Sequence, residues 1–164
     1  MKKILCVFIA LLLLGGCGGK NSKEVENEPL DFGGFQTTVT TVINDITVSA
    51  DTVYKPYESL DFTFISPETV NGMQISCRDG EYTLTSNGLT FTFSSDKMPF
   101  SMLCKALESC LDCVRGVIPD ADGAYTYNSD GRLCKLFVDT DTGCFQKLTV
   151  DGADVLYFEN FSFI

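Results

Sequence analysis

The chain contains no histidine. This absence excludes the Ser-His-Asp and Cys-His arrangements that activate nucleophiles, and it removes the commonest metal ligand. The sequence also lacks a glycine-rich phosphate loop ahead of a helix, and it has no Walker or dinucleotide-binding pattern. Because no complete catalytic motif is left, we expect a protein that is not an enzyme and that needs neither a cofactor nor a metal.

Two acidic patterns resemble functional motifs but are incomplete. Asp141-Thr142-Gly143 spells the triplet of aspartic proteases, whose chemistry requires two aspartates that share a proton at a dry, symmetric interface. Asp139 with Asp141, and Asp120 with Asp122, have the spacing of a calcium loop without its further oxygen ligands and closing glutamate. The sequence favours solvated turn carboxylates at these positions.

The apolar run at the start of the chain is short. Ile4–Leu14 covers less than ~20 Å as a helix, whereas a bilayer core is ~30 Å thick. Lys2 and Lys3 precede the run, which is the pattern of a secretory signal peptide. The ending Leu14-Gly15-Gly16-Cys17 resembles the bacterial lipobox, in which the cysteine thiol receives diacylglycerol and becomes the first residue. The alternative is an ordinary signal peptide that happens to contain this cysteine.

The sequence therefore predicts a lipoprotein signal peptide over residues 1–16 and lipidation at Cys17. A multi-chain anchor, palmitate included, holds firmly because each buried methylene contributes ~0.8 kcal/mol. We expect the mature protein to be extracytoplasmic and anchored by its lipid to the cell membrane.

Basic residues are scarce. Removal of residues 1–16 takes away two lysines, so ten basic residues face 22 acidic ones and the net charge becomes −12. This charge argues against nucleic acid and anionic lipid surfaces as partners. Residues 17–34, apart from the lipidated cysteine, are polar and predict a flexible tether. The remaining residues, 35–164, suit one domain with its own core.

That domain is dominated by alternating strand patterns. Asp45–Tyr54, Ser59–Ser66, Gly72–Cys77 and Gly88–Ser95 place apolar residues at every second position, as half-buried antiparallel strands require. Four more strands are expected after residue 123. Dipeptides suited to type I′ turns separate the runs: Asn71-Gly72, Asp79-Gly80, Asn87-Gly88, Asp130-Gly131 and Asp151-Gly152. We predict a mainly β (α+β) fold, a curved antiparallel meander or half-barrel of about 9–11 strands.

One segment has helical rather than strand spacing. Between Met98 and Arg115, apolar residues recur three and four positions apart, with Pro99 suited to a first turn and Gly116 to a C-terminal stop. The expected inward face is Leu103, Leu107, Cys110, Leu111 and Val114. The sequence predicts one amphipathic helix, over about residues 99–115, inserted mid-chain.

A single helix covers only part of one sheet face. A curved sheet with spare apolar surface either binds a ligand or hides that surface under its own loops. The sequence hypothesis is that an apolar ligand binds the face formed by Phe62, Phe64, Met73, Ile75, Phe91 and Phe93. The alternative is that these side chains are ordinary core.

The order of these features resembles the LolA/LolB-like half-barrel superfamily of envelope lipoproteins. The resemblance is carried by short stretches within residues 35–164: Tyr54–Leu60 running to Pro67, Asp79-Gly80, Asn87-Gly88-Leu89, Asp139–Gly143 and Phe158–Phe161. It implies an unclosed barrel whose concave, apolar side accepts acyl chains or a partner's hydrophobic segment. The chain departs from the family in two ways, since residues 18–34 look unable to form the usual plug helix and Phe145 stands where a proline is common.

Six cysteines follow the lipobox, and in an exported chain they allow fifteen pairings into three disulfides: Cys77, Cys104, Cys110, Cys113, Cys134 and Cys144. The Cys110–Cys113 pair has C-x-x-C spacing, but it lies near the helix C-terminus, where the dipole raises a thiol pKa rather than lowering it. Zinc would need a second closely spaced pair, which Cys134 and Cys144 do not form. Structural disulfides and buried free thiols both remain open.

Two function classes follow. The first is a lipid-anchored half-barrel that binds an apolar ligand or acyl chain without catalysis. The second is a tethered scaffold or sensor that binds another envelope protein through its acidic surface and an open strand edge.

Overall fold

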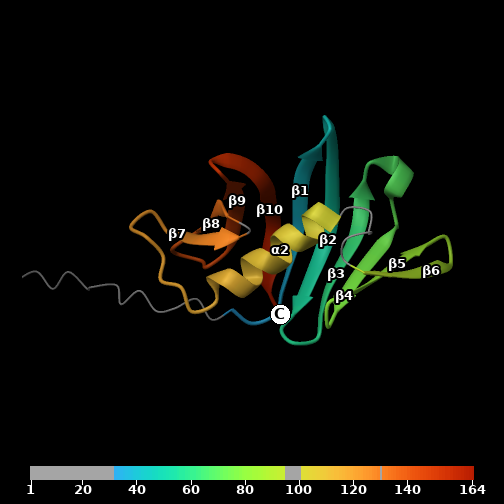
Figure 1. Cartoon of the computed structure of the whole chain (residues 1–164), viewed down its shortest axis with the longest axis horizontal. Coiled ribbons are helices and arrows are strands. Elements are labelled where there is room, and N and C mark those ends of the chain that lie inside the picture. Colours follow the sequence, from blue (N-terminus) through green and yellow to red (C-terminus); the bar gives the residue numbers. More distant parts are fainter. Residues whose placement is uncertain (1–31, 95–100, 130) are drawn as a thin grey trace, which may run out of the picture.

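The computed structural model describes residues 32–94, 101–129 and 131–164. Ten antiparallel strands form one sheet in the order β6-β5-β4-β3-β2-β1-β10-β9-β8-β7 (Figure 1). The strands are β1 (Phe35–Ile43), β2 (Ile46–Lys55), β3 (Ser59–Ser66), β4 (Gln74–Arg78), β5 (Glu81–Ser86), β6 (Leu89–Ser94), β7 (Ala124–Ser129), β8 (Arg132–Val138), β9 (Phe145–Val150) and β10 (Ala153–Phe163). A short 3-10 helix, η1 (Glu68–Val70), follows β3, and helix α2 spans Ser101–Val114.

The sheet has two arms. Strands β1 to β6 form the first arm and β7 to β10 the second, and the pairing of β10 with β1 joins them. Strands β6 and β7 lie at opposite edges and do not pair, so the curved sheet stays open, with α2 against its hollow side (Figure 1). This is the predicted half-barrel, with ten strands and a helix inserted between the arms.

Tight turns fix the strand register. Asp79-Gly80, Asn87-Gly88 and Asp151-Gly152 have positive φ at both positions, which confirms the predicted type I′ hairpins. Asn44 and Asp45 form a further turn of this kind, with φ of 50° and 65°. Asp45 therefore belongs to the β1–β2 turn and not to the strand that the alternation had placed it in.

The Asn71-Gly72 pair differs from this pattern. Only Gly72 has a positive φ, of 80°, while Asn71 ends η1 with a φ of −58°. The pair thus closes a helical connection rather than a two-residue hairpin. Asp130 lies outside the described residues, although Gly131 beside it has the expected positive φ.

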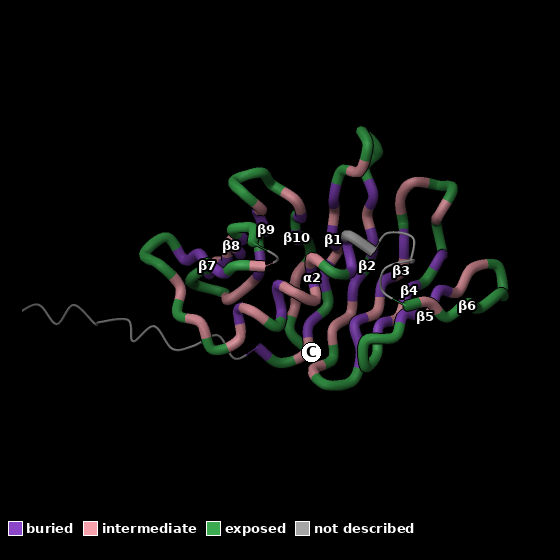
Figure 2. Tube along the Cα trace, in the orientation of Figure 1, coloured by how far each residue is buried: buried purple, intermediate pink, exposed green. Residues whose placement is uncertain are grey.

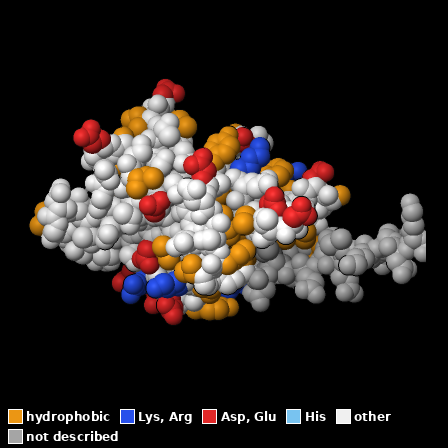
Figure 3. Space-filling view, turned by 180° about the vertical axis from the view of Figure 1, so that it is seen from behind, with side chains coloured by type: hydrophobic (Ala, Val, Ile, Leu, Met, Phe, Trp, Pro, Cys, Tyr) orange, Lys and Arg blue, Asp and Glu red, His pale blue; other side chains and the backbone are white. Residues whose placement is uncertain are grey.

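Cross-strand rows explain the two faces of the first arm. Buried residues alternate with less buried ones along β2 and β3 (Figure 2). One row on the face away from α2 is polar throughout: Thr38, Asp51, Thr63, Gln74, Thr85 and Thr90. Seen from behind, the part of the first arm that β4 to β6 form is largely free of hydrophobic side chains (Figure 3). The opposite face is apolar and turns toward α2, as the period-two pattern predicts.

Helix α2 matches the predicted stripe. Leu103, Leu107, Cys110, Leu111 and Val114 are at most 3% exposed, and Cys104 is also fully buried. Gly116 has a φ of 77°, a conformation that suits a helix stop. The predicted first turn at residues 99 and 100 lies outside the described residues. No helix in the described ranges is long and apolar enough to cross a membrane.

The base of the half-barrel is aromatic. Phe32, which the composition had placed in the tether, is 4% exposed and packs edge-on against Phe145, with ring centroids 5.5 Å apart. Arg115 follows α2 and donates hydrogen bonds to the hydroxyls of Tyr54 and Tyr57, both at 2.9 Å. Its guanidinium also lies 5.7 Å from the Phe32 ring centre. The core therefore begins before residue 35.

Candidate ligand-binding groove

A groove of about 1170 Å³ lies between α2 and the second arm of the sheet. This volume exceeds the ~300–1,000 Å³ typical of small-molecule sites. The groove is formed by one flank of α2, the end of β1 and strands β7 to β10. Its apolar lining is Val42, Ile43, Leu103, Ala106, Cys113, Tyr127, Cys134, Leu148, Val150, Val155, Leu156 and Tyr157.

The groove has a buried floor and an exposed rim. Leu103, Leu148 and Leu156 are at most 3% exposed, whereas Val42 and Tyr157 at the rim are 63% and 44% exposed. An apolar ligand that enters from solvent would therefore first contact the exposed apolar side chains of the rim. It would then reach the buried side chains of the floor. Space remains on the helix side because Ala106 and Ser109 are small.

Charges of both signs border the groove. Lys105 and Arg132 lie there with Glu108, Asp112 and Asp154. Asp154 accepts hydrogen bonds from the Tyr157 hydroxyl at 2.7 Å and from Lys147 at 3.0 Å. These bonds, first that from Tyr157, lower the pKa of Asp154. The border thus carries no concentrated charge of one sign.

Polar contacts tie α2 to both arms. On the first arm, the Glu108 carboxylate accepts hydrogen bonds from the Cys77 thiol of β4 and the Tyr82 hydroxyl of β5. Burial, aided by the bond to Glu108, raises the pKa of Cys77 to about 12. On the second arm, the hydroxyl oxygens of Ser109 and Ser129 are 2.7 Å apart. The helix is therefore held across the hollow of the sheet.

The six residues predicted to bind a ligand lie together in the first arm, outside this groove. Along the row Phe62, Ile75, Leu84 and Phe91, exposure is 1%, 1%, 8% and 48%, so only the edge strand is uncovered. Phe64 is fully buried, Met73 is 9% exposed and Phe93 is half-buried. None of the six lines the groove. Ligand contact by these residues stays a prediction, and the buried ones would first have to be uncovered.

The six cysteines that follow residue 31 are all free thiols. Four of them are buried, whereas Cys113 and Cys144 are half-buried, and the predicted choice between disulfides and buried free thiols stays a prediction. Cys110 and Cys113 lie in the last turns of α2, as predicted for the C-x-x-C pair. Within the described ranges, no group of three or more cysteine, aspartate or glutamate side chains is placed to hold a metal ion.

The acidic motifs are turns. Asp139 accepts hydrogen bonds from the backbone N–H groups of Asp141 and Thr142, at 3.1 and 2.8 Å, and from the Thr142 hydroxyl. These bonds lower the pKa of the exposed Asp139 carboxyl. Asp120 likewise accepts the N–H groups of Asp122 and Ala124. The interpretation as turn carboxylates is consistent with both sites.

The groove was not predicted, because the ligand-binding hypothesis followed the phenylalanines of the first arm. The second arm was predicted as strands, and Leu148, Val150 and Leu156 sit in plain alternating or apolar patterns. The available signal was the pair of small residues, Ala106 and Ser109, on the flank of the helix that faces these strands. A flank of small side chains leaves volume that large sheet residues do not fill.

No family model and no curated protein matches the chain. Among solved structures, it is similar to an uncharacterized conserved protein from Thermus thermophilus, at 12% identity and a TM-score of 0.49, over 80% of this chain and 79% of that one. It is also similar to a LolA superfamily protein from Nitrosomonas europaea, at 9% identity and a TM-score of 0.42, over 84% of this chain and 89% of that one. The half-barrel assignment rests on the chain's own ten-stranded open sheet and its enclosed helix.

Proposed function

We propose that this protein is a lipid-anchored extracytoplasmic lipoprotein that binds an acyl chain or another apolar ligand and catalyses no reaction. The observation that carries the proposal is the groove between α2 and the second arm, with its buried apolar floor and open rim. Each methylene that moves from water onto such a floor contributes ~0.8 kcal/mol. An elongated aliphatic chain therefore gains the most from a groove of this size.

Binding can be tested on the full chain carrying Cys17→Ser, which removes the proposed lipidation site. We expect this chain to take up a fluorescent fatty acid, because the groove is open to solvent at its apolar rim. Fluorescence titration measures the uptake, and native mass spectrometry without detergent reports lipid retained from the host. No uptake together with no retained lipid would contradict the binding proposal.

The anchor is supported by the Leu14-Gly15-Gly16-Cys17 stretch, which lies outside the described residues. Cells supplied with labelled palmitate are expected to incorporate the label into the wild-type chain. The Cys17→Ser chain should carry none, since the acceptor thiol is absent. Label that persists in this variant would overturn the proposed anchor and leave the binding proposal standing.

The alternative function, a tethered scaffold for another envelope protein, is favoured by one observation. Strand β6 is an edge strand without charged residues, and its Leu89 and Phe91 are 61% and 48% exposed. A partner's strand could add to such an edge. Crosslinking that captures one envelope partner, with no ligand bound to the groove, would support this alternative over the first.

A further inference from the structure

Two thiols line the groove from different elements of the fold. Cys113 lies on α2 and Cys134 on β8, and both line the groove. Cys134 is 5% exposed, and Cys113 is half-buried and reachable from the groove. They belong to two elements, separated in the chain by β7, that form different walls of the same site.

Helix α2 and strand β8 also contact one another. Cα atoms of α2 and β8 come within 8 Å of one another. A disulfide requires Cα atoms about 4.4–6.8 Å apart, so its formation would bring Cys113 and Cys134 to that separation.

We propose that Cys113 and Cys134 form a disulfide that fixes α2 to β8 across the groove and closes the groove to ligand. That the bond closes the groove to a ligand rests on the proposed function, whereas the formation of the bond does not. The oxidant is another disulfide, of a small thiol or of a protein. A bond between two lining residues on different walls would occupy the space that a ligand needs.

The exchange balances in two steps. The Cys113 thiolate attacks one sulfur of the oxidant, which forms a mixed disulfide and releases one thiolate. The Cys134 thiolate then attacks the Cys113 sulfur and releases the second. The protein loses two protons and two electrons, and the oxidant is reduced to two thiols.

The other thiols are poorly placed for this reaction. Cys110 is fully buried, and burial raises its pKa to about 12. Burial raises the pKa of Cys77 to about 12 as well, and it also raises the pKa of Cys104. Cys144 follows the β8–β9 turn, where its thiol faces the Thr142 carbonyl, and it does not line the groove. Cys113 is therefore the accessible attacking group.

The test uses the full chain with Cys6→Ser and Cys17→Ser, so that only the six thiols of the described part remain. After incubation with oxidised glutathione, we expect a mass loss of two hydrogen atoms and a cross-linked peptide pair containing Cys113 and Cys134. Cys113→Ser and Cys134→Ser should abolish the cross-link, and Cys110→Ser should preserve it. Absence of the cross-link, or its survival in Cys113→Ser through Cys110, would overturn the proposal.

Fatty-acid titration of the same samples tests the closure. We expect binding to weaken by about tenfold or more on oxidation and to recover on reduction. Equal binding by both forms would overturn the closure. If the cross-link forms but the reduced chain binds no fatty acid, the proposed function fails and the disulfide stands.

Discussion

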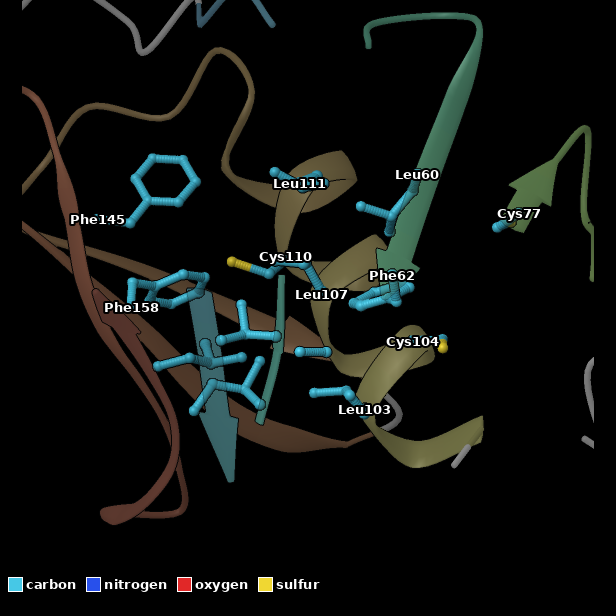
Figure 4. Packing of buried hydrophobic residues seen from close by; sticks show 14 of the residues in the cluster. Leu60, Phe62, Cys77, Leu103, Cys104, Leu107, Cys110, Leu111, Phe145 and Phe158 are labelled. Atoms are coloured by element: carbon cyan, nitrogen blue, oxygen red, sulfur yellow. The ribbon is translucent and has the colours of Figure 1, made fainter. Parts of the chain in front are cut away.

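Replacement of Phe62 by alanine is expected to lower the free energy of unfolding by about 3–5 kcal/mol. Phe62 is 1% exposed and lies beneath α2, where it and Leu107 point into the same interior (Figure 4). Truncation removes a buried ring and leaves a cavity that the strands of the sheet cannot collapse into. Denaturant unfolding of the full chain carrying Cys17→Ser measures the change.

Phe91→Ala is the matched control. Phe91 lies in the same cross-strand row at the sheet edge and is 48% exposed, so its loss is expected to cost about 1 kcal/mol or less. Fatty-acid binding should survive both substitutions wherever the protein stays folded. Near-wild-type stability in Phe62→Ala, combined with lost fatty-acid binding, would show instead that Phe62 contacts the ligand.

Local patterns predicted much of this fold. The type I′ turns at Asp79-Gly80, Asn87-Gly88 and Asp151-Gly152 follow from residue types that tolerate positive φ. The inward faces of β3 and α2 follow from periods of two and about 3.6 residues. These features depend on neighbours in sequence, and a single sequence therefore reveals them.

The site depends on packing between distant segments, which local patterns do not encode. The sequence shows that α2 has an apolar stripe, but not that the stripe lies over Phe62. Nor does it show that the flank with Ala106 leaves a groove beside β7 to β10. Phe32 was placed in the tether for the same reason. Its neighbours in sequence are polar, and the sequence does not reveal its contact with Phe145.

A tryptophan at position 106 is expected to weaken fatty-acid binding by about tenfold or more. Ala106 lies on α2, lines the groove and is half-buried, so an indole there can project into the open volume without displacing the core. If the indole excludes ~60–100 Å² of apolar contact with the ligand, the binding free energy falls by about 1.5–2.5 kcal/mol. This loss corresponds to at least a tenfold weaker affinity. Titration with a fluorescent fatty acid measures it.

The most direct measurement is that titration on two variants of the full chain, both carrying Cys17→Ser. Ala106→Trp fills the groove, whereas Ala121→Trp places the same side chain on an exposed turn that does not line it. Weakened binding in Ala106→Trp, with wild-type binding in Ala121→Trp and equal thermal stability, is the predicted result. Equal binding by both variants would contradict a ligand site between α2 and the second arm.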